Sequence, residues 1–392
     1  MQETAYLDNA CTGLVHVDIA AKAHSVIDKF LNNRKDATNF TVALYDEFEE
    51  GRRSVAHTLR VPERTVCFIE STSHGLGMIA NSIPLEKDDN ILICDLEFLS
   101  TVLCWRKRME KTGFHIKTVK TDNGKVPLDT FKAAADSKTK AIVVSSVQEI
   151  NGYRVDVKAL SRFAREIGAY LIVDGIQEAG ALDPHIDEID VDVYCAGGHK
   201  WLRNPFGAGF LYINEKLLPF VEPDFYSYFN TKSPPGGWGP YLESPLRTPF
   251  DPLVMTTDAC KFETGATPNY AGVLALVKAF ELIRSKGIKT IENEVLDRRR
   301  YLQGKLLKAG ASICGSTDEE NLSGICTFNI PGGIEKEKEL VKLFLEKDIY
   351  CSLRYISNVG GIRLGAHYYT SYEELDYLIE TVKGFIKSAN IR

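Results

Sequence analysis

The chain has 392 residues and a formal net charge of −6 at pH 7, with 44% hydrophobic and 26% charged residues. This length allows two domains with a sizeable core, and the acidic balance gives no reason to expect nucleic acid or an anionic membrane as a partner. No apolar run reaches the roughly 18 residues of a membrane span, and the first residues do not have the pattern of a signal peptide. Nine scattered cysteines without a CxxC pair are typical of reduced thiols in a cytoplasmic enzyme, and we expect no metal site.

In chain order, two helical patterns that end near residues 31 and 59 precede an alternation of apolar strands and amphipathic helices. Strands are expected at 65–69, 90–94, 115–120, 141–147 and 207–213 and in two runs that end near Asp174 and Lys200, with helices at 71–81, through 105–109, 128–135 and 157–167. This order predicts an α/β fold, a mainly parallel sheet covered by helices on both faces. In such folds the ligand lies beyond the carboxyl ends of the strands.

The alternation stops at 217–258, which is rich in proline and glycine. Loops of this length are commonly functional, and 224–241 is our candidate for a specificity element that covers the site. A helix at 270–286 then leads to a smaller α+β domain with helices at 288–309, 335–347 and 372–389 and strands at 324–330, 349–353 and 361–364. We therefore expect an N-terminal segment 1–20 that contributes to the active site, a large domain 21–268, and a linking helix with a small domain 269–392.

Two of the apolar runs end in chemically useful residues, Asp174 in Leu-Ile-Val-Asp-Gly and Lys200 in Gly-Gly-His-Lys-Trp. A lysine amine forms the Schiff base of pyridoxal 5'-phosphate, and a carboxylate on the ring nitrogen lets the ring act as an electron sink. We expect Lys200 and Asp174 to be catalytic and to bind this cofactor, with the Gln177 amide donating to the phenolic oxygen of the ring. A solvated lysine and a turn aspartate are the ordinary alternatives, but they leave the pairing unexplained.

The stretch Ser71-Thr-Ser-His-Gly75 follows a strand and opens a helix. Small hydroxyl residues are common helix caps, yet the free N–H groups and the dipole of a helix N-terminus also bind phosphate. Beside a cofactor lysine, the stretch predicts a phosphate site at Thr72 and Ser73.

Taken together, these motifs resemble the class V aminotransferases of PLP fold type I, which include cysteine desulfurases, isopenicillin N epimerase-like proteins and kynureninase. The resemblance runs in order along nearly the whole chain, from Tyr6-Leu-Asp-Asn-Ala-Cys-Thr-Gly13 through Asp174-Gly-Ile-Gln177, Gly198-His-Lys-Trp201 and Phe262-Glu-Thr-Gly-Ala-Thr-Pro-Asn269 to Arg363-Leu-Gly-Ala-His-Tyr-Tyr-Thr370. It implies that His199 also contacts the phosphate. It further implies that Thr267 reaches the phosphate of a neighbouring subunit, so that the active unit is a homodimer.

The resemblance also implies where an amino-acid substrate binds. Arg363 matches the arginine that holds the α-carboxylate, for which a bidentate guanidinium is well suited. Ala10 and Cys11 lie in the loop that lines the substrate pocket, and Arg354 is a further candidate for substrate binding. Arg154 is expected in a structural turn with Asp156, with a role in substrate binding as the alternative.

Several positions depart from the family pattern. Phe98 stands where desulfurases carry a ring-stacking histidine, and it can stack on the cofactor but cannot move protons. Gly197 replaces a phosphate-binding serine, and the N–H groups of Gly197 and Gly198 are expected to substitute for it. The loop before Arg363 has no mobile cysteine, and Cys351 fits a core thiol better than a persulfide carrier. Glu149, where relatives have an apolar residue or asparagine, either tunes the ring, meets a cationic substrate group or is solvated.

These departures leave the reaction open among several outcomes. We expect a β-elimination (C–S) lyase acting on an α-amino acid first. Transamination comes next, and then racemisation or epimerisation, for which Phe98 is unsuited as the second base. Cβ–Cγ cleavage of the kynureninase kind is a further alternative. A degenerate cofactor-binding protein without activity is disfavoured because Lys200 and Asp174 are both present.

Overall fold

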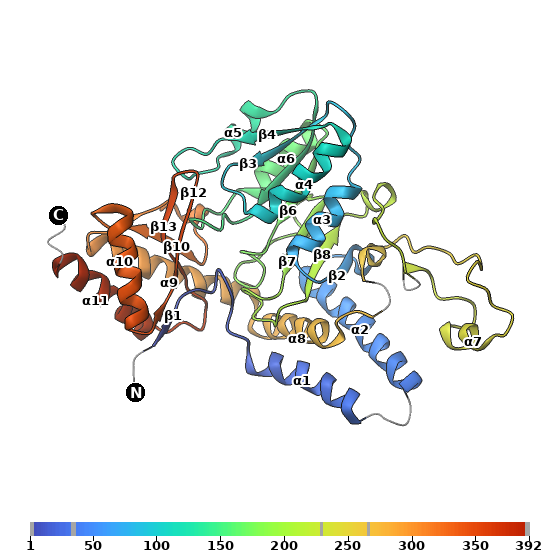
Figure 1. The fold of residues 1–392 in the computed structure, drawn as a ribbon. Coiled ribbons are helices and arrows are strands. Elements are labelled where there is room, and N and C mark those ends of the chain that lie inside the picture. The colour runs from blue at the N-terminus through green and yellow to red at the C-terminus, as the bar shows by residue number, and fades with distance from the viewer. Residues whose placement is uncertain (1–3, 33–36, 228–229, 265–266, 389–392) are drawn as a thin grey trace.

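The computed structural model of the protein describes residues 4–32, 37–227, 230–264 and 267–388 (Figure 1). Its larger part is built on a seven-stranded sheet of order β2-β8-β7-β6-β5-β3-β4. The strands are β2 (Val66–Ile69), β3 (Asn90–Cys94), β4 (His115–Val119), β5 (Thr139–Ser145), β6 (Tyr170–Asp174), β7 (Val193–Gly197) and β8 (Gly209–Ile213). The strands from β7 to β4 are parallel, while β8 runs antiparallel to both β2 and β7. The predicted fold class, α/β with a mainly parallel sheet, is confirmed.

Helices cover both faces of this sheet. They are α1 (Val17–Asn32), α2 (Ala37–Leu59), α3 (Thr72–Ser82), α4 (Leu99–Thr112), α5 (Leu128–Ala134), α6 (Val157–Glu166) and α8 (Tyr270–Lys286). Side chains alternate between the faces along each strand: in β5, Ile142 and Val144 enter the core that contains α2, α5, α6 and α8, and Val143 enters the core under α3 and α4. The helix α2 ends at Leu59, where the second helical pattern was expected to end.

The smaller part combines a four-stranded sheet, order β12-β13-β10-β9, with three helices (Figure 1). Its elements are α9 (Ile288–Lys308), β9 (Ser312–Ile313), β10 (Ile325–Asn329), α10 (Gly333–Glu346), β11 (Ile349–Tyr350), β12 (Ser352–Ile356), β13 (Val359–Gly365) and α11 (Tyr372–Ser388). The single strand expected at 349–353 is wrong, because β11 pairs with β1 (Ala5–Tyr6) in a separate sheet. That pairing ties the N-terminus to the small part. The two parts share α9, which places Val295 in the large core and Leu302 in the small one.

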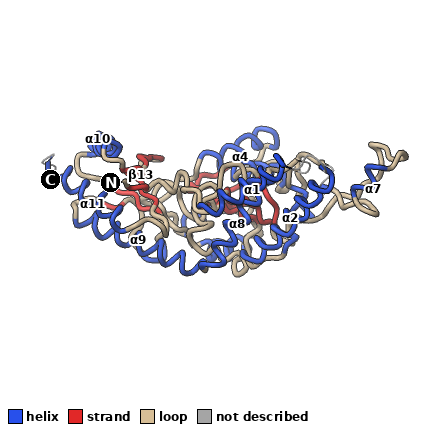
Figure 2. Tube along the Cα trace, turned by 90° about the horizontal axis from the view of Figure 1, so that it is seen from below, coloured by secondary structure: helices blue, strands red, loops and turns tan. Residues whose placement is uncertain are grey.

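Between β8 and α8 a long arm carries α7 (Trp238–Glu243) away from the body, so that α7 and the C-terminal helices lie at opposite ends of the molecule (Figure 2). None of the residues 231–258, all of which are described, is buried. The expectation that 224–241 covers the site of its own chain is wrong, because the arm extends outward. Among the described residues, no helix has both the length and the apolar character needed to span a bilayer.

Candidate active site

Asp174 is the last residue of β6, at the carboxyl edge of the parallel strands. Its Oδ2 accepts a hydrogen bond from the Thr101 hydroxyl at 3.0 Å, and its Oδ1 accepts one from the Ile176 N–H at 3.0 Å. Burial raises the pKa of Asp174, while these two donors and the nearby Lys200 amine act in the opposite direction. The carboxylate is therefore buried, fixed at both oxygens and dependent on a cationic partner.

The expectation that Lys200 ends a strand is wrong, because β7 stops at Gly197 and the lysine lies in the turn that follows. The side chain is half-buried, with Nζ 5.9 Å from the centroid of the Phe98 ring. Burial is the main cause that lowers the pKa of Lys200, and Arg363 adds to it, whereas Asp174 and Glu149 oppose it. Desolvation thus favours the neutral, nucleophilic amine.

The N-terminal loop packs directly on the lysine turn. Gly13 donates from its N–H to the His199 carbonyl at 2.9 Å, and a Cβ at Gly13 would lie 1.9 Å from the Lys200 carbonyl oxygen. The Gln177 amide donates to the Ala10 carbonyl at 3.0 Å and accepts from the Trp201 indole at 2.8 Å. Gln177 and Ala10, both expected at the site, therefore lie together behind Lys200.

The N-terminus of α3 lies beside the end of β7. Ser71 caps the helix by accepting from the His74 N–H, and the buried Thr72 hydroxyl accepts from the Gly197 N–H at 2.8 Å. A Cβ at Gly197 would meet Thr72 Oγ1 at 3.2 Å and His199 Nδ1 at 3.3 Å, so glycine keeps this corner open. The expectation that the Gly197 and Gly198 N–H groups replace the serine is wrong, because they already donate to Thr72 Oγ1 and to the Ala208 carbonyl.

Two further side chains border this corner. Ser73 is exposed in the first turn of α3, where backbone N–H groups have no helical acceptor. The His199 ring stacks on Phe206 at 5.0 Å, and burial, helped by Lys200, lowers the pKa of His199 to about 4. His199 is therefore a neutral imidazole, able to donate one hydrogen bond and accept another.

On the opposite side, Arg363 extends from β13 of the small part and is only 2% exposed. Its Nη1 donates to the Glu149 carboxylate and, at 3.1 Å, to the Glu149 carbonyl. Its Nη2 lies 3.4 Å from the Ser352 hydroxyl and 3.6 Å from an Asp8 oxygen, while the buried Nε has no partner. Glu149 is thus not solvated but paired with the predicted carboxylate-binding arginine.

Four further residues that the sequence singled out are more exposed than Asp174 and Arg363. Arg354 on β12 is exposed and donates to the Leu353 carbonyl, and Thr267 is exposed just before α8. Cys11 is exposed at the N-terminal loop. Cys351 is half-buried, and burial raises the pKa of its thiol to about 12, which keeps it protonated at neutral pH. The substrate roles of Arg354 and Cys11 and the cross-subunit role of Thr267 stay predictions.

Sequence reasoning missed two polar residues at the strand ends. Thr101 in α4 orients Asp174, and the buried Glu97 accepts from the Ser145 N–H at 2.9 Å and from the Gln148 amide at 2.8 Å. Both belong to the stretch Glu97-Phe-Leu-Ser-Thr101, in which only Phe98 was singled out. A threonine about one helical turn after Phe98 is the sequence feature that could have indicated a hydroxyl donor near Asp174.

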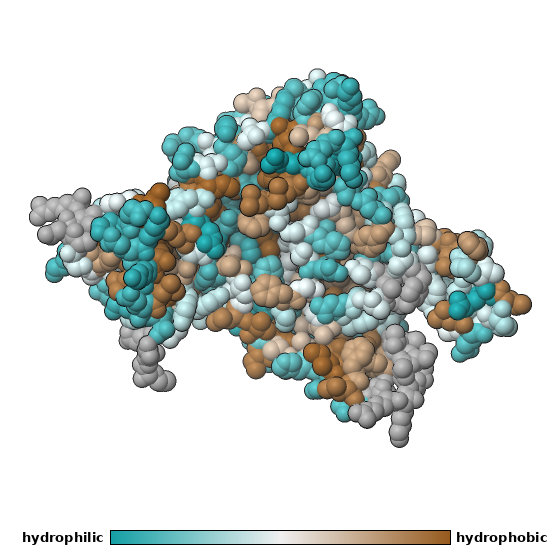
Figure 3. Space-filling model, in the orientation of Figure 1, coloured by the Kyte–Doolittle hydropathy of each residue, from teal (hydrophilic) through white to brown (hydrophobic). Residues whose placement is uncertain are grey.

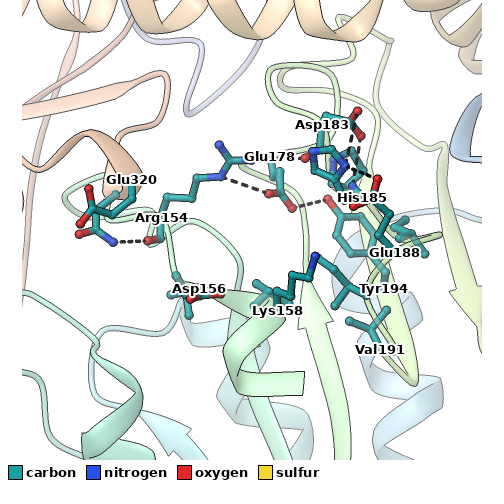
Figure 4. Close-up of a pocket in the computed structure, with 16 residues that line it drawn as sticks. Arg154, Asp156, Lys158, Glu178, Asp183, His185, Glu188, Val191, Tyr194 and Glu320 are labelled. Carbon is teal, nitrogen blue, oxygen red and sulfur yellow. Dashed lines mark hydrogen bonds and ion pairs between the residues drawn. The ribbon is translucent and has the colours of Figure 1, made fainter. Parts of the chain in front are cut away.

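A cavity of about 390 Å³ lies behind the turn that follows Asp174 (Figure 4). There Arg154 lies 3.8 Å from a Glu178 oxygen and 2.6 Å from Glu292 in α9, and the Tyr194 hydroxyl donates to Glu178 at 3.0 Å. Asp156 instead caps α6 through the Ala159 N–H. The sequence places Arg154 in a structural turn with Asp156; in the structure its ion pairs are with Glu178 and Glu292, and they connect the turn after Asp174 to α9.

The donor set fits pyridoxal 5'-phosphate. Four features match the aldehyde, ring nitrogen, ring face and phosphate of that molecule. They are the desolvated amine of Lys200, the buried carboxylate of Asp174 with its two donors, the ring of the 47% exposed Phe98, and the N-terminus of α3 beside Gly197. The protein is an enzyme that depends on this cofactor.

Comparisons with known proteins place it more closely. The family model of aminotransferase class V matches residues 5–378, and the chain belongs to this family. It is 24% identical to a probable cysteine desulfurase of Methanothermobacter thermautotrophicus, over 98% of this chain and 95% of the relative. It is 25% identical to an uncharacterized aminotransferase of Bacillus subtilis, over 88% of this chain and 85% of that protein.

Solved structures share the fold at low sequence identity. An apo cysteine desulfurase from Thermococcus onnurineus superposes with a TM-score of 0.84 at 20% identity, covering 98% of this chain and 95% of that one. The cystine C–S lyase C-DES, in complex with its product cysteine persulfide, gives a TM-score of 0.87 at 18% identity, with 97% of each chain covered.

Proposed function

We propose that the protein is a β-elimination lyase that releases a sulfur leaving group from Cβ of an α-amino acid. The observation that carries this proposal is the placement of one desolvated amine, Lys200, against an apolar ring, Phe98, 5.9 Å away. Elimination needs a single base, whereas inversion at Cα needs a second one on the opposite face. The structural likeness to a cystine C–S lyase is in keeping with this chemistry.

In the proposed mechanism, the bound cofactor withdraws electrons from Cα. Lys200 removes the Cα proton and holds it on Nζ, and the desolvation that lowers its pKa favours the basic form of the amine. Asp174 would pair with the ring nitrogen, and Thr101 and the Ile176 N–H, which donate to its two oxygens, favour its charged form. Arg363 holds the α-carboxylate. The leaving group departs from Cβ with its electron pair, and with one water the products are a thiol, pyruvate and ammonium.

The half-buried thiol of Cys351 favours this proposal over a desulfurase reaction. The pKa of Cys351 is raised to about 12 by burial, so this thiol is a poor persulfide acceptor at neutral pH. The sulfur-containing leaving group would itself be the product, released from the protein as a free thiol or persulfide.

The test is a product assay with a panel of amino acids, cystine and S-alkyl cysteines among them. We expect pyruvate and thiol in equal amounts, without a second keto acid, and neither from Lys200→Ala. Keto acid formed only when an amino acceptor is added would identify a transaminase, and inverted amino acid would identify an epimerase; either result contradicts the lyase proposal.

We also propose a homodimer as the active unit, in a cytosolic setting. Two features support the dimer: Thr267 is exposed at the start of α8, and the arm before it, residues 231–258, has no buried residue. Leu246 and Phe250 on this arm are 86% and 91% exposed, and the arm carries apolar surface in Figure 3. A second copy of the chain would cover this surface.

A further inference from the structure

The guanidinium of Arg363 already has two carboxylates around it before any substrate binds. The side-chain carboxylate and the backbone carbonyl of Glu149 both accept hydrogen bonds from Nη1 of Arg363. An Asp8 oxygen lies 3.6 Å from Nη2. The side chain of Arg363 is 3% exposed, so that no edge of the fork faces open solvent. An α-carboxylate that binds to Nη1 or Nη2 has to take the place of one of these acceptors, because a third anion on one cation is repelled by the other two.

Glu149 is the acceptor that can yield. Asp8 is held by the Ser352 hydroxyl, which donates to it at 2.5 Å, and its backbone bridges to Gly365. The carboxylate of Glu149 has Arg363 as its partner, is 17% exposed, and belongs to the turn after β5. A rotation of this one side chain would take the carboxylate away from Nη1, which would keep only the Glu149 carbonyl as an acceptor, and would leave the Glu149 carboxylate in the pocket.

The freed carboxylate would then lie close to the reacting centre. Glu149 and Arg363 both influence the pKa of Lys200, in opposite directions, so the three groups share one electrostatic environment. The displaced Glu149 carboxylate does not stabilise the binding of a substrate with an uncharged side chain, and it repels an acidic side chain. A substrate side chain with an ammonium group pairs with the Glu149 carboxylate in place of Arg363.

We propose that Glu149 is a specificity-determining residue that masks Arg363 and selects α-amino acids carrying a second amino group. This inference rests on the proposed function of the site as an amino-acid site. It differs from a positioning role, in which Glu149 would only orient Arg363, because masking and positioning change the affinity for neutral amino acids in opposite directions.

The experiment compares the cofactor-loaded wild type with Glu149→Gln. Binding of alanine, aspartate and 2,3-diaminopropionate is measured by calorimetry and by the change in cofactor absorbance, with KM and kcat measured separately for substrates that turn over. We expect the variant to bind alanine and aspartate about tenfold more tightly and diaminopropionate about tenfold more weakly, with the larger change in KM rather than in kcat. Glu50→Gln removes a similar Glu–Arg pair at the surface, with Arg53, and serves as the matched control.

Two results would overturn the inference. Weaker binding of alanine by Glu149→Gln would mean that Glu149 positions Arg363, and an unchanged preference among the three ligands would mean that Glu149 selects nothing. Both leave the proposed function intact. A wild type that takes up no cofactor, or binds none of the amino acids, would instead refute the proposed function.

Discussion

At the scale of single residues, Glu97 is a buried carboxylate next to the strand end that carries Asp174. It is 2% exposed and accepts hydrogen bonds from Ser145 and Gln148. Burial nevertheless raises the pKa of Glu97 from 4.5 to about 7, since desolvation outweighs these donors and the nearby Asp174 carboxylate adds to it. Between these two pH values the folded protein holds a proton that the unfolded chain has lost.

This proton makes stability depend on pH in a defined direction. Because the pKa is raised in the folded state, the stabilisation is complete below about pH 4.5 and is lost as the pH rises through about 7. The free energy of unfolding of the wild type, minus that of Glu97→Gln, should fall by roughly 3 kcal/mol across this range. Urea unfolding of both proteins at about pH 4.5 and about pH 8 measures it, and a constant difference would show that Glu97 is ionised throughout.

At the scale of elements, the site depends on two loops whose backbones meet. Gly13 approaches the turn of Lys200 so closely that a Cβ would lie 1.9 Å from the Lys200 carbonyl oxygen and 3.5 Å from the Arg203 Cα. The clash is with backbone, so no side-chain rotation relieves it, and the turn would have to move. The N-terminal loop therefore sets the position of Lys200, the predicted cofactor lysine.

Gly13→Ala should displace Lys200 without unfolding the protein. We expect the dissociation constant for pyridoxal 5'-phosphate to rise about tenfold and the stability to fall by roughly 1–3 kcal/mol, the usual effect of overpacking. Gly304→Ala is the control, because nothing lies within 4 Å of the added Cβ in the middle of α9. Titration of the cofactor absorbance and urea unfolding measure both quantities, and wild-type cofactor affinity in Gly13→Ala would refute the role of this contact.

The same two loops show what the sequence can predict. Lys200 and Asp174 follow apolar runs, and this local pattern was enough to predict the cofactor and, with the alternation of elements, the α/β fold. The contact of Gly13 with Lys200 and the pairing of Glu149 with Arg363 join residues that are far apart in the chain. Such pairings depend on how the small part packs against the large one, and no periodicity encodes that packing. The same reason explains why the sequence did not predict the ion pair between Arg154 and Glu292.

At the scale of the whole molecule, contacts within one chain do not account for what stabilises the arm, residues 231–258. Residues 231–258 contribute to none of the apolar cores among the described residues. Ordering a backbone costs about 1–2 kcal/mol per residue, which burial normally offsets. The exposed Leu246 and Phe250 are the side chains through which a second copy would stabilise the arm, and Thr267 follows the arm by only a few residues.

Replacing Leu246 and Phe250 together by serine should weaken the dimer at least about tenfold, because each buried large side chain contributes about 1.5–3 kcal/mol. Sedimentation over a range of concentrations measures this, with Leu345→Ser on the exposed face of α10 as the control for losing an exposed leucine. The variant should also retain its cofactor less well, since Thr267 would no longer reach the phosphate of the partner subunit. A double variant that dimerises like the wild type would show that the arm is not part of the interface. A wild type that stays monomeric would contradict the proposed homodimer.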